Sequence, residues 1–177
     1  MNRKILSLGI ALTALFSCQS NAVATKIVYT TVKNCAETVA NDNAAFSELN
    51  CGALGGSTLR IKQQSPQYFT LLLNTAGATA TSELETYTAE APMEPGKVIE
   101  WHLSDNQPRF MVFRISFQPD GGKATQLLTL NLVAKDRICP LASIDTAKTA
   151  KANEKIHELI KADFANTKEC PQNILAI

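Results

Sequence analysis

The cysteines constrain the fold of this chain more than any other feature of its sequence. Cys35, Cys51, Cys139 and Cys170 all follow an N-terminus of the exported type. An even number of cysteines in a small exported domain is typical of disulfide bonds, because compartments outside the cytoplasm are oxidising. Three connectivities are open to four cysteines, and we predict the one that is local in sequence, Cys35–Cys51 with Cys139–Cys170. Each bond would stabilise the fold by roughly 3 to 4 kcal/mol through the entropy of the unfolded chain.

The N-terminus predicts export. A basic start precedes an apolar run at 5–16, which is the pattern of a secretory signal peptide. The run is too short for a membrane-spanning helix, which needs roughly 20 residues, and we expect no transmembrane segment elsewhere. Ala22 and Ala24 fit the small residues of a cleavage site. We therefore predict a signal peptide at 1–24 and a single exported domain at 25–177.

A second cleavage site competes with the first. The sequence LFSC at 15–18 resembles a bacterial lipobox, and cleavage there would leave Cys18 lipidated at the new N-terminus. The two sites predict different locations. Simple cleavage makes the protein periplasmic or secreted, whereas lipidation anchors it to the outer membrane.

The charge balance excludes one class of partner. The chain has 17 Lys and Arg against 16 Asp and Glu, so it lacks the basic excess that marks a nucleic-acid-binding domain. We therefore expect no nucleic-acid partner. The exported part, about 150 residues, has the size of one ordinary domain and is long enough to bury a core.

Apolar and β-branched segments predict a sheet-rich chain. Strands are expected at 26–32, 58–63, 68–73, 98–103, 109–117 and 125–134. The polar segment at 34–56 reads as a loop closed by a disulfide, and the acidic stretch at 82–94 reads as a loop or a short strand. Together the patterns predict an α+β fold: an antiparallel sheet of five to seven strands with a C-terminal helix packed on its apolar face.

The Cys139–Cys170 bond also predicts where this helix begins. A helix from Ala150 to Asn166 would be roughly 24 Å long, whereas the Cα atoms of a disulfide lie about 5.5 Å apart. The chain before the helix must therefore run back alongside it. We predict an extended segment at 140–148 and a helix that starts near Thr149 or Ala150.

The clearest hairpin joins 98–103 to 109–117. We expect Trp101 to face Met111 and Leu103 to face Arg109, with a core face made by the residues Ile99, Trp101, Leu103, Met111, Phe113, Ile115 and Phe117. The opposite face carries polar residues. If the strand at 58–63 is a neighbour, the candidate binding residues form one mixed-charge patch for an anionic ligand or a partner protein: Arg60, Glu100, His102 and Arg114. The simpler interpretation is a solvated sheet face with a Glu100–Arg114 pair.

No specific catalytic or metal signature is present, so we predict no catalytic residue, no metal and no cofactor. His102 lies near Ser104 and Asp105, but adjacent strand residues point to opposite faces, which does not assemble a triad. Cys139, His157 and Cys170 lie too far apart in sequence for a compact zinc motif. His157 is expected off the apolar stripe of the helix, at its boundary.

Three features together resemble small secreted bacterial proteins of uncharacterised function, chiefly proteobacterial. They are VIEWHLSDNQPRFMVFRISF, ICPLASIDTAKTAKANEKI and the paired-cysteine loop that precedes both. The resemblance implies export and disulfides and transfers no active residue. We expect a non-enzymatic periplasmic or cell-surface binding protein, whose partner is another extracytoplasmic protein or an envelope component. The alternatives are an envelope hydrolase with an unrecognised active site and a structural envelope lipoprotein.

Overall fold

The computed structural model describes residues 26–40, 47–52, 54, 58–65, 68–74, 82–83, 87–88, 92–118, 122–134 and 138–177. The predicted signal peptide at 1–24 lies outside these residues, and so does the candidate lipidation site Cys18. The acidic stretch at 82–94 is described only in part. Among the described residues, no helix is long and apolar enough to cross a membrane.

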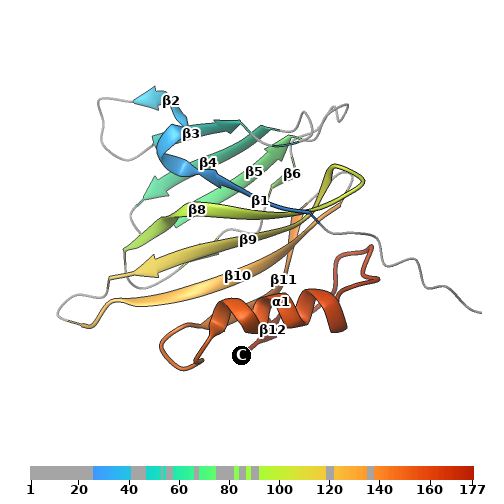
Figure 1. Ribbon diagram of the computed structural model, residues 1–177. Coiled ribbons are helices and arrows are strands. Elements are labelled where there is room, and N and C mark those ends of the chain that lie inside the picture. The colour runs from blue at the N-terminus through green and yellow to red at the C-terminus, as the bar shows by residue number, and fades with distance from the viewer. Residues whose placement is uncertain are drawn as a thin grey trace, which may run out of the picture.

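The described residues form two six-stranded sheets, a 3-10 helix and one α-helix, arranged as Figure 1 shows. The first sheet has the order β1 (Lys26–Thr31), β8 (Met93–Ser104), β9 (Gln107–Phe117), β10 (Thr125–Val133), β11 (Ile138–Asp145) and β12 (Leu175–Ala176). Its pairs are antiparallel except β11 with β12. The second sheet has the order β2 (Ala36–Ala40), β3 (Ser47–Gly52), β4 (Thr58–Ser65), β5 (Tyr68–Asn74) and β6 (Ser82–Glu83), and β7 (Tyr87–Thr88) also pairs with β5. A short 3-10 helix, η1 (Val32–Asn34), links β1 to the second sheet, and α1 (Ala152–Ala162) is the C-terminal helix.

The predicted α+β class, the C-terminal helix and the two disulfides are confirmed, and the first sheet has a strand number within the expected range. The second sheet was not predicted. The segment at 34–56, expected as a loop, contains β2 and β3, which continue the ladder of β4. These strands were missed because they are polar, and the hydrogen bonds that hold them are made by backbone groups that any sequence carries.

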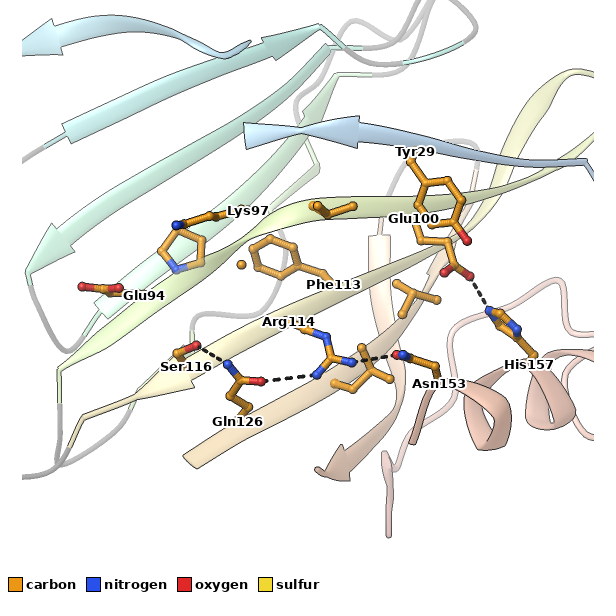
Figure 2. A pocket seen from close by; sticks show the side chains of 15 residues that line it. Tyr29, Glu94, Lys97, Glu100, Phe113, Arg114, Ser116, Gln126, Asn153 and His157 are labelled. Carbon is orange, nitrogen blue, oxygen red and sulfur yellow. Dashed lines mark hydrogen bonds and ion pairs between the residues drawn. The ribbon is translucent and has the colours of Figure 1, made fainter. Parts of the chain in front are cut away.

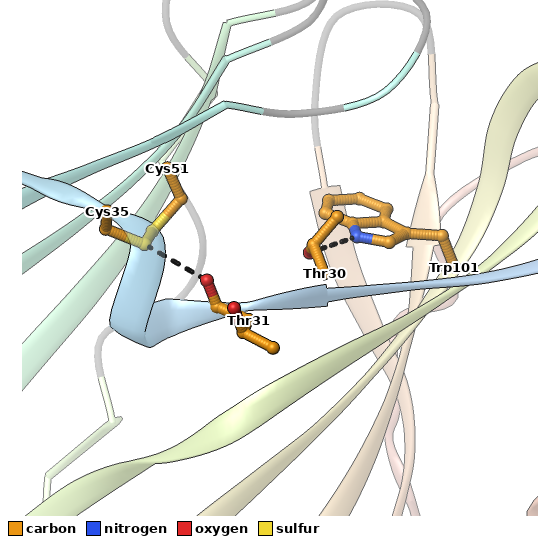
Figure 3. The surroundings of a disulfide bond; sticks show 5 residues. All are labelled: Thr30, Thr31, Cys35, Cys51 and Trp101. Carbon is orange, nitrogen blue, oxygen red and sulfur yellow. Dashed lines mark hydrogen bonds between the residues drawn. A yellow bond between two sulfur atoms is a disulfide. The ribbon is translucent and has the colours of Figure 1, made fainter.

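The two sheets bury one core between them. Its centre is made by Leu59 and Ile61 of β4 and by residues of the β8–β9 hairpin, namely Ile99, Trp101, Met111, Phe113 and Ile115. Trp101 is fully buried, and its indole N–H donates a hydrogen bond of 2.8 Å to the Thr30 hydroxyl of β1 (Figure 3). The face of the hairpin that was predicted to form the core is therefore confirmed as a core face.

The helix packs on the opposite face of the first sheet. The residues that meet it include Phe110, Val112, Leu128, Leu130, Leu141 and Ile144 from the strands and Ala152, Ile156, Leu159 and Ile160 from α1. The prediction that α1 covers the Trp101 face was wrong, because the second sheet covers that face. In β9 the apolar residues follow one another without alternation, which is typical of a strand buried on both faces.

The hairpin register agrees with one of the two expected pairs and departs from the other. Trp101 faces Met111, but Leu103 faces Pro108 and not Arg109. Asp105 and Asn106 have φ values of 52° and 61°, as in the tight two-residue turns that suit the twist of a hairpin. The shorter turn is matched by a bulge beside Leu103, which frees Arg109 from strand pairing.

Both disulfides join the cysteines that were predicted to pair. Cys35 follows η1 and Cys51 lies in β3, so this bond fixes the place where the chain passes from one sheet to the other (Figure 3). The contact of 3.9 Å drawn from the Cys35 sulfur to the Thr31 carbonyl oxygen is a van der Waals contact, since a disulfide sulfur carries no proton.

The second disulfide closes the C-terminal unit. Cys139 lies in β11 and Cys170 follows α1, 31 residues later. Between them the chain is extended as far as Asp145, turns, and enters the helix at Ala152. The predicted order of extended segment and helix is confirmed, but the extended segment ends at Asp145 and not at 148, and the helix starts two residues later than Ala150. The guanidinium of Arg109 donates hydrogen bonds to the carbonyl oxygens of Ala165 and Thr167, just after the helix.

Replacement of Cys139 and Cys170 together by alanine is expected to lower the free energy of unfolding by about 4 kcal/mol, because the bond closes a long loop of the unfolded chain. Urea unfolding without reductant measures the change. The wild-type protein treated with a reductant that opens both bonds should lose more. A loss below about 1 kcal/mol would show that the bond does not constrain the unfolded chain.

Candidate functional site

An open pocket of about 640 Å³ lies on the helix-covered face of the first sheet (Figure 2). The helix packs over β9, β10 and β11, so β1 and part of β8 remain uncovered beside it. Charged and polar side chains from five elements reach the pocket, among them Tyr29 of β1, Glu100 of β8, Arg114 of β9, Gln126 of β10 and His157 of α1.

Gly96 allows β8 to pass close to Arg114 of β9 at the pocket. It lies in β8 within an irregular stretch of the β8–β9 ladder, between Pro95 and Ile99. A Cβ atom placed on Gly96 would lie 2.8 Å from the Cβ of Arg114 and 3.0 Å from the Arg114 carbonyl oxygen. Only glycine permits this approach, so Gly96 determines how closely β8 passes Arg114.

Glu100 is the centre of the site. Its Oε1 atom lies 2.5 Å from His102 Nε2 and 2.7 Å from His157 Nε2. Because an ionised carboxylate only accepts hydrogen bonds, both Nε2 atoms act as donors. Glu100 and His102 are two residues apart and share one face of β8, whereas His157 comes from α1. The side chain of His102 is 4% exposed, that of Glu100 is 15% exposed and that of His157 is 32% exposed.

The two histidines determine the charge state of the carboxyl group. Partial burial raises the pKa of Glu100, but the hydrogen bonds from His102 and His157 outweigh burial and hold that pKa below its ordinary value. Tyr29 is the direct cross-strand partner of Glu100. Desolvation and then the charge of Glu100 raise the pKa of Tyr29, so its hydroxyl stays protonated and can donate to the carboxylate.

Arg114 provides a fixed positive charge at the other side of the pocket. Its guanidinium donates hydrogen bonds to Asn153 Oδ1 at 2.8 Å and to Gln126 Oε1 at 3.3 Å (Figure 2). Gln126 is in turn held by Ser116, at 3.2 Å. In the part of the chain that the structure describes, these hydrogen-bond partners of Arg114 are neutral. Its positive charge is therefore positioned without being neutralised by them.

The structure brings together three of the four candidate binding residues. Glu100, His102 and Arg114 lie on one face of the first sheet, as predicted. Arg60 lies in β4, whose neighbours are β3 and β5, and it forms an ion pair of 3.1 Å with Glu48. Since Leu59 and Ile61 point into the core, Arg60 points away from it. The four residues therefore do not form one patch.

His157 was missed as a site residue. His157 lies at the boundary of the apolar stripe of α1, as expected, but its position in the sequence gave no reason to expect Glu100 beside it. Glu100 contacts the two histidines and not Arg114 among the described residues. The only signal in the sequence was that a carboxylate and a histidine share one face of an otherwise apolar strand.

The cluster offers hydrogen bonding, acid–base groups and metal ligands. The ligand atoms of Glu100, His102 and His157 all lie within 4.8 Å of one another. Within the described residues, neither histidine forms a hydrogen bond to a serine, threonine or cysteine side chain. The arrangement is therefore not the nucleophile–histidine pair of a serine or cysteine hydrolase.

A Glu100→Gln variant should lose stability in a pH-dependent way. The pKa of Glu100 is lower in the folded than in the unfolded chain, so the stability due to its charge is present above about pH 4.5 and is lost as the pH falls through the folded value. We expect the variant to be about 1 kcal/mol less stable at pH 7, with the difference shrinking as the pH falls through the folded pKa of Glu100.

Urea unfolding of both proteins across this pH range measures the difference. Glu158→Gln, on the exposed side of α1, is the control and should track the wild type. An equal difference at pH 7 and at pH 3 would contradict the assignment of the charge to Glu100.

Comparison of the chain with protein families, with curated proteins and with solved structures found no match. The resemblance to small secreted proteins of uncharacterised function therefore stays a prediction.

Proposed function

We propose that the protein is an exported binding protein, periplasmic or secreted, which recognises another extracytoplasmic protein or an envelope component through the pocket between Tyr29 and Arg114. The two disulfides support export, because such bonds persist in oxidising compartments. The composition supports a partner other than nucleic acid.

One observation carries the proposal: exposed apolar side chains share a face with Arg114, whose hydrogen-bond partners among the described residues, Gln126 and Asn153, are neutral. Tyr29 is 59% exposed, Val98 is 48% exposed and Ile27 is 40% exposed. All three lie on the pocket face, because Ile27 faces His102 and Tyr29 faces Glu100 across the ladder, while Val98 is two residues before Glu100. Exposed apolar side chains that border a polar site are typical of interaction surfaces. Tyrosine and arginine are also among the residues that contribute most to binding energy.

The alternative of an envelope hydrolase is supported by the Glu100 cluster. A carboxylate between two imidazoles at the edge of a pocket has the groups needed for general acid–base chemistry. The binding protein remains the better-supported proposal, because the described residues place no side-chain nucleophile in hydrogen-bond contact with either histidine. The further alternative, a structural envelope lipoprotein, depends on Cys18, which lies outside the described residues.

Tyr29→Ala and Arg114→Ala are expected to weaken partner binding by about tenfold or more each, since each removes a central contact. The partner is first captured from an exported fraction on the immobilised, oxidised protein. Its affinity for the purified wild type and for each variant is then measured by calorimetry.

Arg60→Ala is the matched control, because it also removes an arginine side chain, but from β4 of the second sheet. It should bind the partner as the wild type does. Equal affinities of wild type, Tyr29→Ala and Arg114→Ala would overturn the proposal, and so would a loss on Arg60→Ala as large as that on Arg114→Ala.

A further inference from the structure

The convergence of Glu100, His102 and His157 on one point requires a reason beyond the packing of α1. Two imidazole Nε2 atoms from different elements approach the same carboxylate oxygen, at 2.5 and 2.7 Å. The rings meet edge to face, with their centroids 5.4 Å apart. The chain has only two histidines, and the fold brings both to the same carboxylate.

The orientation of the rings is that of metal ligands. A hydrogen on Nε2 and a lone pair on Nε2 point in the same direction in the plane of the ring. Both Nε2 atoms now point at Glu100 Oε1, so with neutral rings of the other tautomer both lone pairs would point there too. An ion 2.0 to 2.2 Å from each ligand fits this point after a carboxylate shift on the order of one bond length.

We propose that Glu100, His102 and His157 bind a divalent transition-metal ion, with zinc the best match. Imidazole and carboxylate are ligands that zinc prefers, and two histidines with one glutamate form an established zinc donor set. Two neutral imidazoles and one carboxylate leave a bound Zn²⁺ with a net charge of about +1. The three side chains supply three of four ligands, and the fourth position opens toward the pocket.

The surroundings hold the three ligands in place. Glu100 and His102 are fixed by the β8–β9 ladder, and His102 is buried. Arg114 binds Asn153, one turn before His157 on α1. Tyr29 is the neighbour of the Glu100 carboxylate on the solvent side. Such outer contacts orient the ligands of metal sites and raise their affinity.

Zinc titration of the full chain tests the site. The chain is prepared without a histidine tag, with Cys18→Ser so that no free thiol competes, with both disulfides oxidised and after removal of metal by a chelator. Isothermal titration calorimetry with zinc chloride should give one ion per chain. His157→Gln and Glu100→Gln should each weaken the affinity by about tenfold or more.

Glu158→Gln is the control for nonspecific binding to surface carboxylates, because Glu158 neighbours His157 and is exposed. It should bind zinc with wild-type affinity. A second readout is independent of heat signals: zinc should raise the melting temperature of the wild type and of Glu158→Gln but not that of His157→Gln. Circular dichroism verifies that each variant is folded, and His157→Gln is the decisive variant because its side chain is the most exposed of the three.

Absence of stoichiometric binding below millimolar zinc would overturn the proposal, and so would equal affinities of wild type and folded His157→Gln. The metal site and the proposed partner site are tested separately. A protein that binds its partner but no zinc refutes only the metal site, and one that binds zinc but no partner refutes only the proposed function.

Discussion

The pairing of β8 with β9 is the interaction on which the rest of the structure depends. These two strands lie inside the first sheet, and their side chains alternate between the face toward the second sheet and the face toward α1. Trp101 and Met111 point toward the second sheet, whereas His102 and Phe110 point toward the side of α1. A register shift by one residue would exchange the two sets. The register that the Asp105–Asn106 turn sets between β8 and β9 therefore defines both the core and the site.

The polar residues of β8 conflict with their surroundings. In the segment 98–103, Glu100 and His102 interrupt an apolar run and lie on a face that is largely covered. Burial of a carboxylate and an imidazole carries a desolvation cost, which here is offset by their mutual hydrogen bonds and by His157. Two apolar residues at these positions would not carry that cost. Positions where a sequence departs from the local rule without gaining stability are where function is expected.

The parts of the fold that were predictable depend on local sequence or on covalent geometry. The facing of Trp101 with Met111 follows from alternation in two clear strands. The extended segment after Cys139 and the late start of α1 follow from the length of a helix and the reach of a disulfide. The bulge at Arg109 was not predictable, because turns of two and of five residues are both compatible with the sequence between the strands.

Two kinds of feature were missed. The strands β2 and β3 are polar and are held by backbone pairing with each other and with β4, which a pattern of apolar and polar residues does not reveal. The side of the sheet that α1 would cover was ambiguous, because β9 is apolar on both faces. The contact of His157 with Glu100 spans 57 residues and follows only from the face of the sheet that α1 covers. Once α1 is known to lie over Val112, a residue on the boundary of its apolar stripe must reach β8.

The helix owes its position to its attachments. An isolated helix of 11 residues is marginal in water, and Lys151 precedes it with a left-handed φ of 58° and no side-chain cap. Near its first turn Asn153 accepts a hydrogen bond from Arg114, and beyond its last turn Arg109 and the Cys139–Cys170 bond hold the chain. Three attachments to the first sheet leave α1 little freedom to slide. His157 lies between them, so the same contacts that stabilise the C-terminal unit also fix the distance between its imidazole and Glu100.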